Sequence, residues 1–437
     1  MSGRQAREVA QRVLPTWKAE PRMATLAELR DPDTNALVDR AIVTWYAAPR
    51  SYTGEEIVEL SVHGGAVVPA LALGALFAGG ARQALPGEFT RRAVAHGKMD
   101  MLQAEAVGDL VNARSVAMHE AAIGQLEGAL SARITALRSV IIELEALLAY
   151  DIDFPEEDDG PVDATRIVTT VTGLLEALEM LLATATTGEM VRDGAVVVLA
   201  GAPNVGKSSL FNALIGSARA IVTDVPGTTR DAIEAVIDIA RWPVRLIDTA
   251  GLRETGDVVE RLGVELSEQW IARAALILAC GDSPPTIAAV LAATADSTAR
   301  VLTVHTKADL VTNSSYSQST PLPIRPGKLV SDSYYLSTVT GEGLARLVEA
   351  IAQNLASAGG RNAPEVPMLT RERHRRAIML ARDEITEFQH AWREKKLPAP
   401  VAAVHLRTAA GALEELIGVV DVEDVLDRLF STFCVGK

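Results

Sequence analysis

The sequence is poor in the residues that would cross-link a protein or carry it through a membrane. Two cysteines among 437 residues, Cys280 and Cys434, exclude a disulfide framework and a cysteine-rich zinc site. The longest apolar stretch, Val67 to Ala81, contains a proline and is too short to span a bilayer. The N-terminal residues are mixed and charged, unlike a secretory signal. We therefore expect a cytoplasmic protein without a membrane anchor.

Aromatic residues and positive charge are also scarce. Aromatics make up 4% of a chain that is 48% hydrophobic, so we expect cores built mostly from alanine, leucine and valine. Asp and Glu total 56 against 42 Lys and Arg, and the net charge of −14 speaks against whole-molecule attraction to nucleic acid or anionic membranes. A local arginine group is either a nucleic-acid contact or a solvated helix face, and both interpretations stay open. Its members are Arg371, Arg373, Arg375 and Arg376.

The first part of the chain, residues 1–98, mixes short apolar runs with turn signals. Strands are predicted at Ala41–Tyr46 and Ile57–Val62, because β-branched and aromatic residues are concentrated there. A buried helix is predicted at Ala66–Phe77, where almost every residue is apolar. This segment therefore predicts a small α+β domain.

The rest of the chain divides into two helical segments and an α/β segment between them. Residues 99–193 and 357–437 show long helical periodicity, whereas residues 194–356 alternate strand and helix signals. The short apolar strands expected for a buried parallel sheet are Ala195–Ala200, Val244–Asp248, Ala275–Cys280 and Val301–His305. Because the α/β segment interrupts the helices, we expect one discontinuous helical domain with an α/β domain inserted.

A phosphate-binding loop opens the α/β segment. Gly201-Ala-Pro-Asn-Val-Gly-Lys-Ser208 matches G-x-x-x-x-G-K-[ST], after one predicted strand and before a helix at Ser208–Ile215. Backbone N–H groups of such a loop surround phosphates, Lys207 reaches the terminal phosphates, and the Ser208 hydroxyl binds Mg²⁺. A chance glycine-rich turn is the alternative, and the correctly placed strand and helix argue against it.

Three further motifs follow at the ends of predicted strands. Asp248-Thr-Ala-Gly251 supplies an Mg²⁺-linked aspartate and a glycine N–H for a γ-phosphate. Thr306-Lys-Ala-Asp309 carries an aspartate that pairs with guanine but not with adenine. Ser337-Thr-Val339 is expected behind the base. The order of the four elements predicts a guanine-nucleotide site.

Together these motifs resemble a Ras-like GTPase domain, and more narrowly the branch that includes TrmE, Era and EngA. Motifs in the flanking segments narrow the resemblance to the MnmE (TrmE) family of tRNA modification GTPases, over essentially the whole chain. They are Tyr52-Thr-Gly-Glu-Glu, His63-Gly-Gly, Pro86-Gly-Glu-Phe, Gly97-Lys-Met-Asp-Met-Leu-Gln-Ala-Glu-Ala and Phe433-Cys-Val-Gly-Lys437. Two alternatives remain. A ribosome-assembly GTPase would lack the flanking motifs, and a scaffold that only binds nucleotide would not hydrolyse GTP.

This resemblance implies a multidomain α/β + α protein in which each segment has a function. Residues 1–98 would be a tetrahydrofolate-binding and dimerising domain, residues 99–193 and 357–437 the helical domain, and residues 194–356 the Ras-like GTPase domain. The homodimer would work with the flavoprotein MnmG. Using K⁺, Mg²⁺ and 5-formyl- or methylene-tetrahydrofolate, the complex would add an aminomethyl or carboxymethylaminomethyl group to C5 of the wobble uridine of certain tRNAs.

The resemblance also implies roles for individual residues. Lys207, Thr229 and Glu260 would be catalytic, although spacing alone favours a solvated helix-start glutamate at position 260. GTP would contact Asn204, Val205, Gly206, Lys207, Ser208, Ser209, Thr223, Asp224, Val225, Pro226, Gly227, Thr228, Thr229, Asp248, Thr249, Ala250, Gly251, Thr306, Lys307, Asp309, Ser337, Thr338 and Val339. Mg²⁺ would be held by Ser208 and Thr229, and K⁺ by Asn204, Thr223, Val225 and Thr228. Folate would use Glu59, Lys98 and Lys437, with Cys434 serving the modification.

The sequence departs from the family pattern at a few positions. Thr306 stands where Asn is usual, so its hydroxyl would have to tie the base loop to the phosphate loop. Ser337-Thr-Val replaces Ser-Ala-Lys, and Val435 replaces Ile. The N-terminus lies about 20 residues into the family pattern, and loss of a strand exposes its neighbour's backbone. Either translation starts upstream, or folate binding and the N-terminal dimer are weakened.

Overall fold

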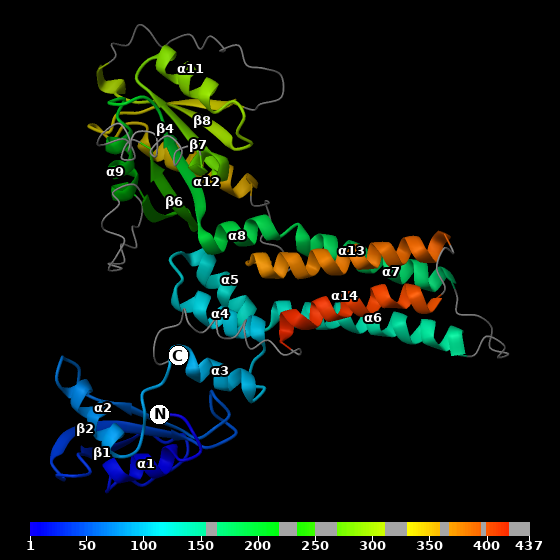
Figure 1. Ribbon diagram of the computed structural model, residues 1–437. Coiled ribbons are helices and arrows are strands. Elements are labelled where there is room, and N and C mark those ends of the chain that lie inside the picture. Colours follow the sequence, from blue (N-terminus) through cyan, green and yellow to red (C-terminus); the bar gives the residue numbers. More distant parts are fainter. Residues whose placement is uncertain are drawn as a thin grey trace, which may run out of the picture. The chain divides into compact units, whose positions relative to one another are not determined.

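The computed structural model describes residues 1–153, 164–217, 234–249, 269–310, 330–358, 367–394 and 399–418 (Figure 1). Their contacts group them into two compact units. The first contains Met1–Gly108, Gln125–Thr135 and the described residues from Leu413 onward. The second contains Asp109–Gly124 and the described residues of Ala136–Ala412.

The first unit contains a three-stranded antiparallel sheet in the order β1-β2-β3. Its elements are α1 (Ala6–Val13), β1 (Thr25–Arg30), β2 (Leu37–Tyr46), β3 (Ile57–Ser61), α2 (Val68–Ala78) and α3 (Glu88–Ala95). Met1 and Ser2 run antiparallel to the start of β3, where the Met1 amino group donates to Val58 O at 2.8 Å. Apolar residues of α1, such as Ala10 and Val13, pack on the buried face of the sheet. The predicted α+β character is confirmed.

Helix α2 differs from its prediction in burial. Only Ala72 and Ala75 are buried, whereas Leu71, Leu73 and Phe77 are 41–52% exposed. A helix that is apolar on every side cannot bury all of its faces against one small sheet. The prediction of a helix is confirmed, and the prediction that it is buried is wrong.

The α/β domain in the second unit has a six-stranded sheet in the order β5-β6-β4-β7-β8-β9. Its elements are β4 (Ala195–Ala200), α9 (Lys207–Ser217), β5 (Glu234–Ile239), β6 (Trp242–Asp248), β7 (Leu276–Gly281), α11 (Pro284–Ala293), β8 (Arg300–His305), β9 (Val330–Tyr335) and α12 (Leu344–Ala358). All pairs are parallel except β5 with β6. The four predicted strands therefore form the centre of the sheet, and their carboxyl ends meet at one edge.

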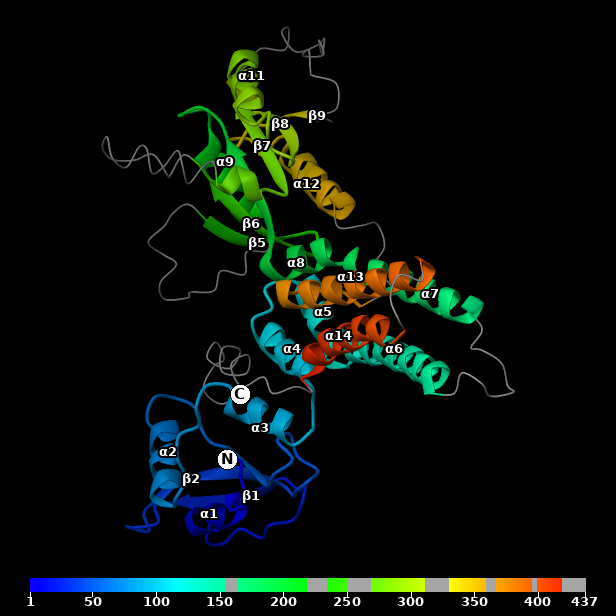
Figure 2. The same cartoon turned by 45° about the vertical axis from the view of Figure 1, so that its right-hand side comes forward.

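Helices that precede the α/β domain in the sequence pack against helices that follow it. Figures 1 and 2 show α13 (Glu372–Glu394) beside α7 (Ala164–Leu182), and α14 (Ala399–Ile417) beside α6 (Ala129–Asp153). The other helices of the two flanking segments are α4 (Met101–Val111), most of which belongs to the first unit, α5 (Val116–Leu126) and α8 (Ala185–Asp193). The Leu369 N–H, just before α13, donates to Thr184 Oγ1 at 3.0 Å, just before α8. The predicted discontinuous helical domain is confirmed.

One described helical stretch, Thr165–Asp193, is long and apolar enough to cross a membrane by composition alone. Its apolar side chains Leu174, Leu178 and Leu181 are buried within the protein. A core helix in a water-soluble fold meets the same criterion, so the stretch does not by itself predict a membrane span.

Candidate functional site

The phosphate loop connects β4 to α9 at the carboxyl edge of the parallel sheet. Gly201 has no room for a side chain, because a Cβ there would overlap Cys280 O. Gly206 has φ +101° and Asn204 has φ +62°, both in the left-handed region. Glycine adopts this region freely and asparagine tolerates it better than most residues. The turn therefore depends on the residues at these three positions.

Lys207 is buried, with 3% of its surface exposed, and it closes the loop from the first turn of α9. Its Nζ donates to Gly201 O at 2.8 Å and to Ala202 O at 2.7 Å. These two bonds hold the ammonium charge inside the loop, since both acceptors are loop carbonyls. The Lys207 ammonium therefore lies where the loop would surround a phosphate.

Ser208 and Asp248 bring two oxygen ligands together from different elements. Ser208 Oγ, on α9, donates to Asp248 Oδ2 at 2.7 Å, and Asp248 ends β6. Oxygen donors are what Mg²⁺ prefers, and it commonly takes its other ligands from substrate phosphates and water. Within the described residues no cluster of three or more His, Cys, Asp or Glu could hold a metal ion. The pair fits an Mg²⁺ that arrives with a nucleotide.

The Thr306-Lys-Ala-Asp309 loop is attached to the phosphate loop by side chains. Thr306 Oγ1 donates to Val205 O, and Lys307 Nζ donates to Asn204 O at 2.7 Å. The tie that the sequence assigns to Thr306 is therefore present. Asp309 is exposed in the following turn, so its carboxylate lies outside the protein core.

The Ser337-Thr-Val339 loop lies against the same base loop. The Ala308 N–H donates to Leu336 O at 3.0 Å, and Ser337 Oγ accepts from the Val339 N–H at 3.2 Å. The structure thus places side by side the loops that begin after β4, β6, β8 and β9. These positions make one continuous site at the sheet edge.

Twelve of the predicted site residues lie outside the described residues. They are Thr223, Asp224, Val225, Pro226, Gly227, Thr228, Thr229, Ala250, Gly251, Glu260, Cys434 and Lys437. The second Mg²⁺ ligand, the K⁺ carbonyls and the water-orienting glutamate all belong to this group. Their roles stay predictions.

The described folate candidates, Glu59 and Lys98, are exposed residues of the first unit, which is called the N-terminal unit from here on. Glu59, on β3, accepts a hydrogen bond from the Tyr46 hydroxyl at 3.2 Å, and its charge raises the pKa of Tyr46. Lys98 follows α3, and its backbone N–H donates to Ala93 O at 2.8 Å. A carboxylate and an ammonium suit a ligand that carries both hydrogen-bond donors and an acid group, as folates do.

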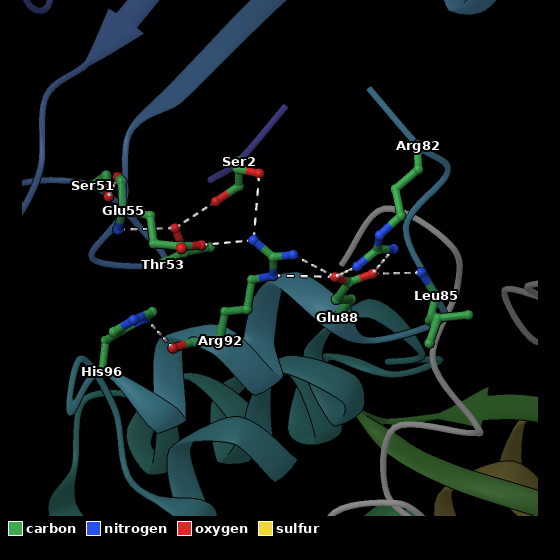
Figure 3. A network of polar contacts seen from close by, with 9 residues as sticks. All are labelled: Ser2, Ser51, Thr53, Glu55, Arg82, Leu85, Glu88, Arg92 and His96. Carbon is green, nitrogen blue, oxygen red and sulfur yellow. Dashed lines mark hydrogen bonds and ion pairs between the residues drawn. The ribbon is translucent and has the colours of Figure 1, made fainter. Parts of the chain in front are cut away.

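A polar network around Arg92 joins four segments of the same unit (Figure 3). The Arg92 guanidinium donates to Glu55 at 2.8 Å, to Glu88 at 2.7 Å and to Ser2 O at 3.4 Å. Arg82 pairs with Glu88 from the other side. The Arg82 hydrogen bonds, followed by the Leu85 N–H and Arg92, lower the pKa of Glu88 to about 2. No sequence motif predicts this network.

Arginines at the start of α13 form ion pairs with acidic neighbours. Arg371 pairs with Asp109 at 2.7 Å, and Arg375 and Arg376 pair with Glu372 at 2.7 and 2.9 Å. Paired guanidiniums attract phosphate less than free ones. Of the two sequence interpretations, these contacts favour the solvated helix face over a nucleic-acid contact.

Sequence reasoning overlooked Asp282, which follows β7 and lies beside the two loops that carry Asn204 and Lys307. Its Oδ2 is 3.2 Å from Lys307 Nζ. The predicted strand Ala275–Cys280 already placed its carboxyl end at the nucleotide edge of the sheet. A search for polar residues directly after that strand would have found it.

Comparison with known proteins covers nearly the whole chain. A family model described as the MnmE helical domain matches residues 101–434, and one described as the GTP-binding protein TrmE N-terminus matches residues 1–98. The tRNA modification GTPase MnmE of Aquifex aeolicus is 38% identical over 445 residues, covering 100% of this chain and 95% of that protein. The Azoarcus sp. protein of the same name is 41% identical over 423 residues, covering 96% and 90%. Among solved structures, the G domain of the T. maritima FeoB iron transporter aligns at 25% identity with a TM-score of 0.26, covering 38% of this chain and 99% of that chain.

Proposed function

The chain belongs to the MnmE family of tRNA modification GTPases, and from that premise we propose that it couples K⁺-dependent GTP hydrolysis to modification of the wobble uridine. It is a GTP hydrolase with a role in tRNA modification. In the proposed reaction the protein acts with MnmG and a folate one-carbon unit. The product carries an aminomethyl or carboxymethylaminomethyl group at C5 of that uridine.

The observation that supports the GTP site best is the meeting of three motifs at one edge of the sheet. Lys207 is directed into the phosphate loop, Ser208 meets Asp248, and Thr306 holds the loop from the base side. In the proposal, these residues bind the phosphates, Mg²⁺ and the loop backbone respectively, and Asp309 selects guanine.

The proposed hydrolysis step needs a group that orients water and a charge at the γ-phosphate. The usual glutamine after Asp248-Thr-Ala-Gly251 is replaced by Leu252, so Glu260 is assigned to orient the water. Bound K⁺ would supply the positive charge that an arginine finger supplies in other GTPases. Asn204 offers a side-chain carbonyl for that ion, with Thr223, Val225 and Thr228.

The domain division is part of the proposal. Residues 1–98 would bind folate through Glu59, Lys98 and Lys437 and would form the homodimer. Residues 99–193 with 357–437 would carry the GTPase domain, residues 194–356, and bring Cys434 to the modification site. A chain of this kind would meet tRNA and MnmG in the cytoplasm.

Mass spectrometry of the wobble uridine in tRNA from a strain that lacks this chain tests the proposal. We expect the C5 substituent to be absent, and to return when the intact chain is supplied. Supplying Asp248→Asn should fail to restore it, whereas the exposed Asp296→Asn in the same domain should restore it. A fully modified wobble uridine in the deletion strain would contradict the modification role and leave an assembly GTPase as the alternative.

Purified protein separates hydrolysis from modification. GTP turnover should be faster in K⁺ than in Na⁺ at equal ionic strength, because Na⁺ is a smaller ion for the same carbonyl ligands. Glu260→Ala should lower kcat with little change in GTP affinity, since a water-orienting group acts in the transition state. Equal rates in the two salts would refute K⁺ dependence but would leave GTP hydrolysis and the modification role standing.

A further inference from the structure

Asp282 holds a position in the nucleotide edge that the motifs do not explain. It follows β7, and the neighbouring Gly281 O accepts the Thr306 N–H at 2.9 Å, so Asp282 is level with the base loop. Its Oδ2 lies 3.2 Å from Lys307 Nζ. Lys307 Nζ in turn donates to Asn204 O at 2.7 Å. One ammonium therefore joins a carboxylate to a carbonyl of the phosphate loop.

The two residues on either side of this ammonium contact have unfavourable backbone conformations. Lys307 has φ +55° and Asn204 has φ +62°, where a Cβ meets the neighbouring peptide. Such conformations persist when surrounding contacts determine them. The contact between Lys307 and Asn204 O connects both residues directly, and Asp282 restrains the lysine from the side.

Holding these carbonyls also decides where the loop N–H groups point. In a trans peptide the N–H of each residue points opposite to the preceding carbonyl. Asn204 O is held by Lys307 and Val205 O by Thr306, both on the base-loop side. The N–H groups of Val205 and Gly206 are therefore directed to the other side, where a phosphate loop binds its anion.

We infer that Asp282 is a positioning residue for guanine-nucleotide binding. Its carboxylate keeps the Lys307 ammonium on Asn204 O, and this contact fixes the N–H groups that bind phosphate. The inference rests on the proposed placement of the nucleotide in these loops. The alternative is an inert surface ion pair, since the Asp282 and Lys307 side chains are 36% and 39% exposed.

Nucleotide affinity, measured by calorimetry with GDP and with a non-hydrolysable GTP analogue, tests Asp282. Asp282→Ala should weaken both by about three- to tenfold, because a partly exposed charged contact is lost. Asp282→Asn should weaken them less, since its amide oxygen still accepts from Lys307. The matched control is Asp296→Ala, an exposed aspartate between α11 and β8, which should leave both affinities unchanged.

A double-mutant cycle with Lys307→Met separates a positioning role from a structural one. If Asp282 acts through Lys307, then adding Asp282→Ala to Lys307→Met should weaken affinity by less than about twofold further. Fully additive losses, or parental affinity in Asp282→Ala, would overturn the inference while the nucleotide site stands. Parental affinity in Lys307→Met would overturn the placement of the nucleotide as well. Thermal unfolding without nucleotide confirms that each variant is folded.

Discussion

The nucleotide loops and the network around Arg92 are both polar, but they are built from different kinds of hydrogen bond. In the loops, Lys207, Thr306 and Lys307 donate to backbone carbonyls of the phosphate loop. In the N-terminal unit, Arg92 and Arg82 bind carboxylates of other side chains, as Figure 3 shows. The first arrangement fixes the path of the main chain, whereas the second depends on the ionisation of glutamates.

This difference has a consequence for how each region responds to change. A backbone carbonyl accepts hydrogen bonds at any pH, so, apart from the Asp282 carboxylate that restrains Lys307, the loop geometry depends on which donors are present. An ion-pair network loses its bonds when a carboxylate takes up a proton. We therefore expect the nucleotide site to be sensitive to single donors and the N-terminal unit to be sensitive to acid.

Removal of the loop's central donor should have the largest effect. Lys207→Met keeps the length of the side chain but leaves Gly201 O and Ala202 O without their ammonium. Loss of one preorganised donor at a developing charge lowers rates by about 10²–10³, and we expect kcat for GTP hydrolysis to fall towards the upper value. Lys18→Met, an exposed lysine in the N-terminal unit, is the control and should hydrolyse GTP normally. A Lys207→Met protein within tenfold of the parent would contradict the site.

Asn204 allows the backbone of the loop to be separated from its proposed ion ligand. Asn204→Gly removes the side chain while keeping the left-handed conformation at φ +62° available. We expect it to bind GDP well and to lose K⁺ stimulation by about 10²-fold, less than an arginine finger contributes elsewhere. Asn204→Ala should lose both GDP affinity and K⁺ stimulation, because alanine resists the left-handed backbone conformation. Hydrolysis rates titrated with K⁺ decide between them, and undiminished stimulation of the glycine variant would exclude Asn204 as a K⁺ ligand.

Acid should distinguish the N-terminal unit from the nucleotide loops. The pKa of Glu88 is lowered from its usual 4.5 to about 2, first by the Arg82 hydrogen bonds. A lowered pKa in the folded protein means that the unfolded chain takes up the proton first. The stability that Glu88 contributes is therefore complete above pH 4.5 and is lost as the pH falls from 4.5 towards 2.

Glu88→Gln makes that acid response measurable. At neutral pH it should lower the free energy of unfolding of the N-terminal unit by about 1–2 kcal/mol, because charge-assisted hydrogen bonds are lost and solvent screens the 63% exposed Arg82. It should also flatten the pH dependence between 4.5 and 2. Hydrogen exchange of β2 amides reports on this unit alone, and the exposed Glu127→Gln is the control. Unchanged acid sensitivity of the Glu88 variant would place the response elsewhere.

The two regions also differ in how far the sequence predicts them. Strand β4, the phosphate loop and α9 follow from the sequence, because a short apolar run followed by the phosphate-loop motif marks them. Strand β9, Val330–Tyr335, was not predicted, since an edge strand rich in serine and tyrosine lacks the apolar pattern of a central strand. The contact of Arg92 with Glu55 was not predictable either, because the pairing of side chains 37 residues apart depends on the finished fold.

Thr306 should show the smallest change and is the most demanding test of the loop architecture. Its hydroxyl donates to Val205 O, and Thr306 is only 3% exposed, so Thr306→Val removes a buried donor from the phosphate loop. We expect about tenfold weaker GDP binding from that nearly isosteric change. Thr306→Asn restores a donor through its amide, but Thr306 is only 3% exposed, so the longer side chain has to pack into a buried position. The regained hydrogen bond favours GDP binding and the tighter packing disfavours it. We therefore expect the GDP affinity of Thr306→Asn, measured by calorimetry, to stay within about threefold of the parent. If Thr306→Asn weakened binding as much as Thr306→Val, the tie to the phosphate loop would require the threonine itself rather than any donor at this position.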